Sequence, residues 1–259
     1  MTRLYAIGDI HGQKSALEDQ LALIDKDGGT QARVVFLGDY VDRGPDSKGV
    51  LDLFINGIKE GRDWVFLKGN HDRMFERFLD SGQTRDERIL SGKLWLHERL
   101  GGTTTLETYL DTAAALEAIG APTRRLESYG IDPMPDDLLL PFLSHVAEAV
   151  PQSHRDFLAN LSLSHEEDGY FFVHAGIRPG LPLSLQEEDD MLWIRDEFLT
   201  DQRNHGALVV HGHTPVDAPE MRINRLNLDT GAGYGRALST AVFEDGAVYH
   251  LNAFGRAAL

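Results

Sequence analysis

Three short polar blocks, each placed directly after an apolar run, recur near the start of the chain. Their spacing is about thirty residues, which is the length of one strand–helix–strand unit. The blocks read G-D-I-H-G at residues 8–12, G-D-Y-V-D-R-G at 38–44 and G-N-H-D at 69–72. Such a repeat would deliver Asp9, Asp39 and Asn70 to the same edge of one sheet. The spacing therefore predicts an α/β chain whose polar blocks converge in space.

The apolar pattern around these blocks predicts alternating strands and helices. We expect strands over residues 3–8, 32–37 and 63–68, and helices over 13–26, 47–59 and from 71 to 79. Residues 80–160 instead favour helices over 94–100, 103–119 and 150–161, with a break at 132–136. We interpret residues 1–259 as one domain with a helical insertion at approximately 80–160. An independent helical domain is the less favoured alternative.

The last third of the chain returns to strands. They are expected at residues 163–165, 170–174, 208–211, 225–229, 238–244 and 247–252, with hairpin signals at Asp168-Gly169 and Asp245-Gly246. Early β-α repeats followed by a late antiparallel run indicate the α/β class. The architecture that we expect is two mixed sheets packed as a sandwich and flanked by helices.

Composition excludes several classes of site. The 259 residues contain no cysteine, which excludes disulfides, thiolate metal ligands and cysteine nucleophiles and fits a cytoplasmic protein. We expect no membrane span, because no apolar run approaches about eighteen residues, and no signal peptide at the N-terminus. A net charge of −16 argues against a nucleic-acid surface. Bound cations and two arginines would make a local positive pocket in this acidic chain.

Two further blocks add imidazoles to the oxygen ligands. They are His174-Ala175-Gly176 and Gly212-His213-Thr214-Pro215. Asp9 and His11 are two residues apart at the end of a strand, so both side chains can face one ion. A turn carboxylate and a surface histidine are the alternative for an isolated pair of this kind. Carboxylate, amide and imidazole groups that converge in this way indicate a two-metal hydrolytic site.

These blocks, together with L-W-I-R at 192–195 and L-D-T-G-A at 228–232, resemble the calcineurin-like metallophosphoesterases. Within them, the chain is more similar to the phosphoprotein phosphatase branch, and there to small bacterial and phage serine/threonine protein phosphatases. The resemblance runs from residue 4 to about 245 and weakens between about 80 and 160. The broader superfamily has a second histidine at the position of Pro215, and the phosphoprotein phosphatase branch also lacks that histidine.

The resemblance implies a ligand set for two divalent ions. The first ion would take Asp9, His11 and Asp39. The second would share Asp39 and take Asn70, His174 and His213. Mn²⁺ suits oxygen and nitrogen ligands, with Fe, Zn or Mg as alternatives.

The resemblance also implies catalytic roles. His71 would be the general acid and Asp42 its carboxylate partner, while Arg43 and Arg195 would hold phosphate oxygens. For Arg195 a surface salt bridge is the alternative, and for Asp72 a place in the first helical turn. His211 is favoured as a buried neighbour of the site over a ligand. Tyr234 is either a pocket residue or an ordinary packed tyrosine.

Three functions follow. The first is a serine/threonine protein phosphatase that acts on phosphoproteins, phosphopeptides and small phosphomonoesters by direct attack of a hydroxide that bridges the two ions. The second is a hydrolase of dinucleoside polyphosphates such as diadenosine tetraphosphate. Asp42 favours the first, because the second typically has V-A-R-G where this chain has V-D-R-G. The third is a catalytically inactive metal-binding module. The oligomeric state is open.

Overall fold

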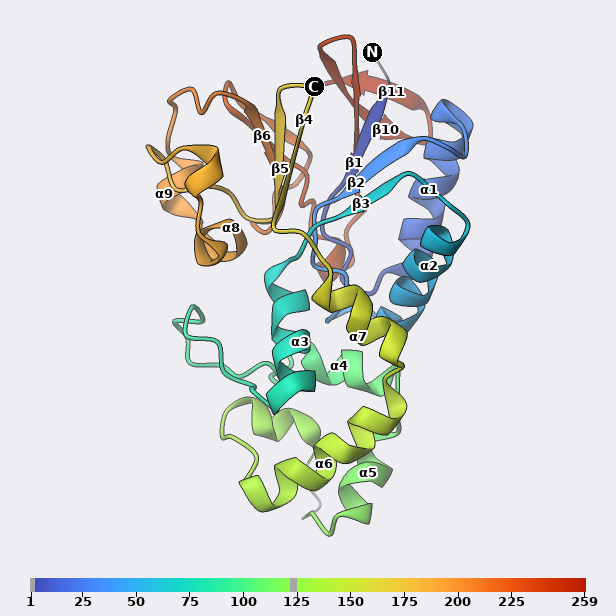
Figure 1. Cartoon of the computed structure of the whole chain (residues 1–259), viewed down its shortest axis with the longest axis vertical. Helices are drawn as coiled ribbons and strands as arrows, with labels where there is room; N and C mark the ends of the chain where they lie inside the picture. Colours follow the sequence, from blue (N-terminus) through green and yellow to red (C-terminus); the bar gives the residue numbers. More distant parts are fainter. Residues whose placement is uncertain (1–2, 122–124) are drawn as a thin grey trace.

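The structure is a computed structural model that describes residues 3–121 and 125–259. Two mixed β-sheets face each other in the upper half of Figure 1. The first sheet has, in spatial order, β11 (Gly255–Ala258), β10 (Ala247–Asn252), β9 (Thr240–Glu244), β1 (Leu4–Ile7), β2 (Arg33–Phe36) and β3 (Trp64–Phe66). The second has β4 (Ser164–Glu167), β5 (Tyr170–Val173), β6 (Leu208–His211), β8 (Arg225–Asn227) and β7 (Glu220–Met221). The predicted sandwich of two mixed sheets is confirmed.

Both sheets combine parallel and antiparallel pairs. In the first sheet the parallel strands form one half and include the edge strand β3, whereas in the second they lie between two antiparallel edge strands. β1, β2 and β3 run parallel, as do β5, β6 and β8, while β9, β10, β11, β4 and β7 pair antiparallel. Parallel neighbours place their carboxyl ends at one edge of the sheet. In each sheet, the loops that follow the parallel strands therefore leave from the same side, where these strands have their carboxyl ends.

Alternation along the strands divides their side chains between two cores. Ala6 of β1 and Val35 of β2 belong to the core between the sheets, whereas Tyr5 and Val34 pack against the helices outside. The outer helices of the first sheet include α1 (Lys14–Gly28), α2 (Ser47–Lys59) and α7 (Gln152–Ala159). Beside the second sheet lie α8 (Glu188–Trp193) and α9 (Asp196–Leu199).

The helical part forms the lower half of Figure 1 and differs in detail from the sequence-based expectation. It contains α3 (Asn70–Ser81), α4 (Gly102–Glu107), α5 (Thr112–Ala118), a 3₁₀ turn (Leu126–Gly130) and α6 (Asp136–Ala149). The helix expected over 103–119 is split in two, because Asp111 caps α5 by accepting from the Ala114 amide at 3.0 Å. α6 was not anticipated.

The helix expected over 94–100 is wrong. These residues form turns, and Leu94, Trp95 and Leu96 are all buried in succession. The Leu94 amide donates to Gly130 O at 2.9 Å and the Trp95 amide to Thr84 O at 2.7 Å, so these amides bond to other segments and not to carbonyls four residues earlier, as a helix would require. Burial of side chains from this segment and from α4 to α7 continues the hydrophobic core under the first sheet. The division into one domain with a helical insertion stays a prediction.

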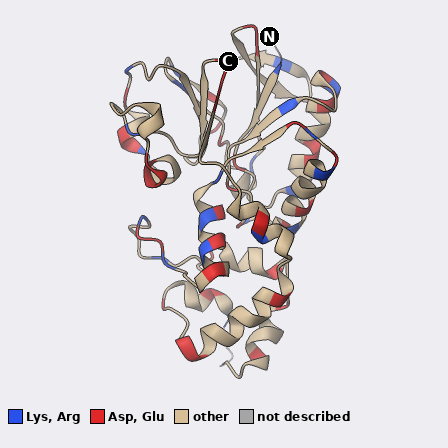
Figure 2. Cartoon of the chain, viewed as in Figure 1, with Lys and Arg blue, Asp and Glu red and all other residues tan. Residues whose placement is uncertain are grey.

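Figure 2 shows acidic residues on most helices, with basic residues interspersed on α3. None of the helices within residues 3–121 and 125–259 combines the length and apolarity that a bilayer crossing needs.

Candidate active site

The strand ends of the two sheets meet at one place. Asp9, after β1, accepts a hydrogen bond from the His213 amide, after β6, at 3.0 Å. Nε2 of His174, after β5, lies 2.9 Å from Oδ1 of Asn70, after β3. The structure thus brings together the predicted ligands, all of them buried: Asp9, His11, Asp39, Asn70, His174 and His213.

The loops that carry these residues have an unusual backbone. Five non-glycine residues of the site have a positive φ: His11, Asp39, Asp42, Arg43 and His213. Such conformations are disfavoured for residues with a Cβ and concentrate at functional sites. Neighbouring glycines permit the close packing: a Cβ at position 212 would lie 1.9 Å from Asp9 Oδ1, and one at position 69 would lie 2.2 Å from the Asp39 nitrogen.

Asp39 stands at the junction of two groups of metal-ligating atoms. It groups with His11 and His71 on one side and with His174 and His213 on the other. Its Oδ2 is 3.4 Å from His11 Nε2, and its Oδ1 is 3.5 Å from His174 Nε2. A carboxylate with one oxygen toward each group has the arrangement expected of a ligand shared by two ions.

The donor atoms of this site fit a cation. Nδ1 of His11 donates to Val41 O and Nδ1 of His174 to Leu37 O, both at 2.9 Å, which leaves Nε2 of each ring as an acceptor. Nε2 of His174 faces Asn70 Oδ1, a second acceptor. Nε2 of His213 is buried without a hydrogen-bond partner among the described residues. Acceptors that converge on one another are stabilised by a shared positive ion.

The pKa shifts of the clustered aspartates and histidines also fit a site for a cation. Burial raises the pKa of Asp39 to about 7, and burial with the neighbouring Asp229 and Asp39 carboxylates raises the pKa of Asp9. Burial lowers the pKa of His174 to about 4 and also lowers that of His213. These histidines are therefore neutral, which is the form that binds a metal ion, while the clustered carboxylates need nearby positive charge in order to ionise.

His71 and Asp42 form a buried pair next to these groups. His71 Nδ1 lies 2.6 Å from Asp42 Oδ2. Asp42 also accepts from Trp95 Nε1 at 2.8 Å and from Thr105 Oγ1 at 2.6 Å. Three donors aimed at one carboxyl group favour its ionised form and place the imidazole proton on Nδ1, although burial raises the pKa of Asp42. Nε2 of His71 then points to Arg43, whose Nη2 donates to it at 2.9 Å.

A cavity of about 720 Å³ opens over this group. Arg43, Arg195 and Tyr234 line it together with His71. The Arg43 guanidinium lies 4.9 Å from the centre of the Tyr234 ring, and Arg195 Nη1 donates to Thr214 Oγ1 at 3.2 Å. Both arginines therefore face the space next to the ligands, and Tyr234 is a pocket residue.

Four other side chains either bond to the residues of the site or line the cavity, and the sequence analysis left their roles open or missed them. Asp72 accepts from the Asp39, Tyr40 and Gly69 amides and so fixes the loop that carries Asp39. Trp95 and Thr105 carried no recognisable signal, since their role depends on a contact with the distant Asp42. Trp193, whose indole nitrogen has no partner among the described residues, lines the cavity and belongs to L-W-I-R.

His211 lies outside the ligand group. Its ring is fully buried, packs 5.1 Å from the ring of Phe198 and has Nδ1 3.1 Å from Gly212 O.

A family model described as calcineurin-like phosphoesterase matches residues 2–237, which is most of the chain. The chain belongs to this family. Calcineurin-like phosphoesterases use a dinuclear centre of divalent metal ions, in agreement with the two groups that share Asp39. The expected resemblance is thereby confirmed, and the chain is a phosphoesterase by family.

Curated relatives have two kinds of name. The asymmetrical bis(5'-nucleosyl)-tetraphosphatase PrpE of Bacillus subtilis is 29% identical over 90% of this chain and 87% of its own. Its counterpart from Halalkalibacterium halodurans is 25% identical over 92% and 89%. Serine/threonine-protein phosphatase 2 of Escherichia coli is 26% identical over 91% and 90%.

Solved structures share the fold of this calcineurin-like phosphoesterase. A suspected diadenosine tetraphosphatase aligns with a TM-score of 0.60 and 22% identity, covering 96% of this chain and 92% of that one. A cold-active protein-tyrosine phosphatase of a psychrophilic Shewanella aligns with a TM-score of 0.55 and 15% identity, covering 100% and 80%.

Proposed function

We propose that the chain is a metal-dependent phosphomonoesterase whose main substrates are phosphoserine and phosphothreonine in proteins and peptides. The observation that supports this most strongly is the buried His71–Asp42 pair, which has Nε2 directed toward the phosphate-holding Arg43. A serine or threonine alkoxide is a poor leaving group and needs a proton. An imidazole fixed by a carboxylate is a suitable proton donor for it.

For the two ions we propose the ligands already described, namely Asp9, His11, Asp39, Asn70, His174 and His213. When bound, divalent ions supply positive charge to the phosphoryl oxygens and acidify a water molecule. Mn²⁺ is our first choice for these oxygen and nitrogen donors, with Fe, Zn and Mg as alternatives. Cytoplasmic residence stays a prediction.

The protein's own residues act on the phosphate and on the leaving group. Arg43 and Arg195 hold phosphoryl oxygens and so orient the ester for in-line displacement. Asp42, fixed by Trp95 and Thr105, keeps the His71 ring in one orientation. His71 in its doubly protonated form then gives the Nε2 proton to the departing oxygen and keeps the Nδ1 proton on the side of Asp42, which leaves a neutral imidazole.

A second candidate is the asymmetrical hydrolysis of dinucleoside tetraphosphates. It is favoured by the names of the relatives from Bacillus subtilis and Halalkalibacterium halodurans. Arg88 and the exposed Tyr234 ring line the same cavity, where they offer a further cation and a stacking surface to a nucleotide. Phosphate leaving groups are less basic than alkoxides, however, and need the proton of His71 less.

The deciding experiment compares kcat/KM for a phosphothreonine peptide and for diadenosine tetraphosphate with the same Mn²⁺-loaded protein. We expect a preference for the peptide. A clear preference for the dinucleotide would replace the first proposal by the second. Failure to hydrolyse either substrate or p-nitrophenyl phosphate would support an inactive metal-binding module.

A further inference from the structure

A buried arginine next to the catalytic histidine joins the two sides of the cavity. Arg73 lies in the first turn of α3 and is 2% exposed. Its Nη2 donates to Asp86 Oδ2 at 3.0 Å. Its Nη1 donates to Asp189 Oδ1 at 2.6 Å and to Glu188 Oε1 at 3.2 Å. One guanidinium thus binds carboxylates from two segments that are far apart in the sequence.

The first of these segments is the insertion loop, residues 84–100. Asp86 is 4% exposed, and its Oδ1 accepts from the Arg88 amide at 3.0 Å while its carbonyl accepts from the Ile89 amide at 3.1 Å. This turn presents the side chains of Arg88, Ile89 and Leu90 to the cavity. Leu90 is 98% exposed, so nothing in the described chain covers it.

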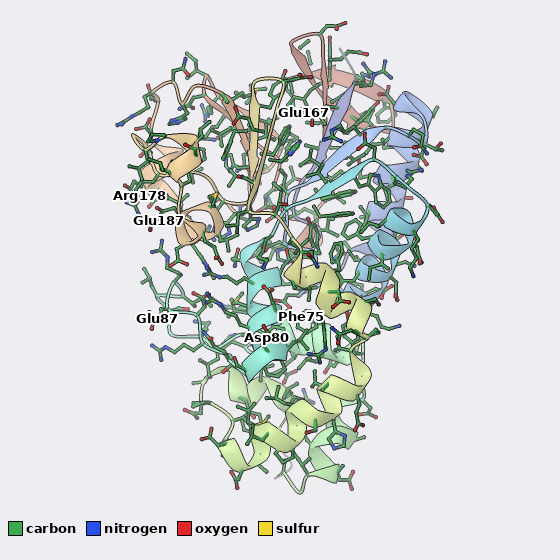
Figure 3. All side chains as sticks on the ribbon, in the orientation of Figure 1. Phe75, Asp80, Glu87, Glu167, Arg178 and Glu187 are labelled. Atoms are coloured by element: carbon green, nitrogen blue, oxygen red, sulfur yellow. The ribbon has the colours of Figure 1, made fainter. Side chains whose placement is uncertain are left out.

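The second is the α8 segment, residues 186–196. Glu188 and Asp189 begin α8, and the helix ends at Trp193, which lines the cavity together with Arg195. The Trp193 ring also lies 5.9 Å from the Arg73 guanidinium. In Figure 3 the labelled Glu87 of the insertion loop and Glu187 of the α8 segment mark these two sides, with α3 beside them.

We propose that Arg73 is a positioning residue that sets the width of the substrate cleft by tying the insertion loop to the α8 segment. This inference rests on the proposed function, since it concerns the part of the substrate beyond the phosphate. In the proposed function the phosphate contacts Arg43, Arg195 and His71, which line the same cavity. A long substrate must also pass between the two tied segments.

Bidentate and multiple contacts of this kind depend on a guanidinium. Arg73 reaches three carboxylates with a planar fork, which a lysine ammonium cannot reproduce. Asp86 also accepts from Arg77 Nη1 at 3.3 Å and from the Arg88 amide at 3.0 Å, whereas Asp189 is half exposed. Removing the Asp189 carboxylate therefore weakens the link between Arg73 and the α8 segment, while Arg73 and Asp86 remain paired with each other and no buried charge is left unpaired.

The test uses Asp189→Ala, with Asp189→Asn as a shape-preserving second variant and Glu187→Ala as the matched control. Glu187 precedes the same helix and is exposed. In the Asp189 variants we expect faster amide hydrogen exchange in residues 84–100 and 186–196. KM for a phosphothreonine peptide should rise about fivefold, which corresponds to about 1 kcal/mol. KM and kcat for p-nitrophenyl phosphate should change much less, because this substrate ends close to the phosphate.

The proposal is overturned if exchange in the insertion loop is unchanged in both Asp189 variants. It is also overturned if KM changes equally for peptide and p-nitrophenyl phosphate, or if Glu187→Ala has the same effects. Arg73→Lys should reproduce the rise in KM for the peptide, and a peptide KM at the wild-type value would count against the tie. If the wild-type protein hydrolyses no phosphoester, the proposed function fails, while the exchange comparison still decides whether the tie exists.

Discussion

At the scale of single residues, the site depends on side chains with neighbours from distant parts of the chain. His71 has Asp42 on one ring nitrogen and Arg43 on the other. Burial and the Arg43 guanidinium lower the pKa of His71. A phosphate dianion that neutralises Arg43 would therefore favour a proton on His71 when the substrate binds. Two predictions follow from the roles that we propose for these residues.

His71→Asn should lower kcat for a phosphothreonine peptide by about 10²–10⁴-fold, the range typical of general acid catalysis. Metal affinity, measured by titration calorimetry with Mn²⁺, should change much less. The loss of kcat should be smaller for p-nitrophenyl phosphate, whose leaving group needs no proton. Equal losses for both substrates would contradict the role of a general acid.

Arg195→Ala should weaken inhibition by inorganic phosphate and leave the melting temperature nearly unchanged. Arg195 is exposed and its side chain donates a hydrogen bond to Thr214, so we expect it to contribute little to stability. Arg203→Ala is the control, since Arg203 is an exposed arginine paired with Asp201 away from the cavity. Unaltered phosphate inhibition in Arg195→Ala would show that Arg195 is only a surface residue.

At the scale of elements, the helical insertion contributes directly to the site. Trp95 precedes α4 and Thr105 lies within it, and both hydrogen-bond Asp42 of the loop after β2. The insertion therefore fixes the partner of the proposed acid as well as lining the cavity. At one edge of the first sheet, the strand β11 is held to α1 by an ion pair between Arg256 and Asp27.

Thr105→Val should destabilise the protein by about 1–3 kcal/mol and lower kcat for the phosphothreonine peptide, because buried groups of Asp42 lose a partner. The hydroxyl donates to Asp42 Oδ1 at 2.6 Å and accepts from the Asp42 amide at 2.8 Å. Thr105→Ser keeps the hydroxyl and should retain most of both quantities. Urea unfolding and steady-state kinetics measure them, and a Val variant that matches the Ser variant would contradict the expectation.

Asp27→Asn should lower the free energy of unfolding at pH 7 and have a smaller effect in acid. Burial would raise the pKa of Asp27, but hydrogen bonds from Arg256 of β11 and Tyr5 of β1 outweigh it and lower the pKa. A lowered folded-state pKa gives stability that is complete above the unfolded value of about 4 and is lost as pH falls through the folded value.

Urea unfolding at about pH 7 and about pH 3 tests the Asp27 prediction, with Asp19→Asn on the exposed face of α1 as the control. The difference between wild type and Asp27→Asn should shrink at the lower pH. A difference that is the same at both values would mean that the ion pair has no net effect.

At the scale of the whole molecule, the residues that we propose as metal ligands come from both sheets. Asp9, His11 and Asp39 follow strands of the first sheet, and His174 and His213 follow strands of the second. Ions bound there would link the sheets in addition to serving the reaction.

Mn²⁺ should therefore stabilise the fold. At a free concentration of about 100 times Kd, one site adds about 2.7 kcal/mol to the free energy of unfolding. Thermal unfolding with EDTA and then with Mn²⁺ measures this change, and Asp39→Asn should reduce it. Activity should disappear with EDTA and return with Mn²⁺. A melting temperature and a rate that are both indifferent to EDTA would contradict the two-ion centre.

The sequence by itself determined the family, the α/β sandwich and the position of the turns that carry the site. Blocks such as G-D-I-H-G place glycine next to residues that need a tight turn, and the preceding apolar runs are strands, so both signals are local. The recognisable motifs also selected Asp9, Asp39 and Asn70 as ligands, a role that stays a prediction even though the residues converge.

Only the tertiary structure decided which distant groups meet these residues. Trp95 and Thr105 reach Asp42 across separations of 53 and 63 residues, and Arg73 reaches Asp189 across 116. The insertion of β9 between β1 and β10, and the turns over residues 94–100, likewise follow from packing. Such contacts form because buried polar groups need partners and apolar surfaces need cover. Neither requirement specifies, in the local sequence, which residue will meet it.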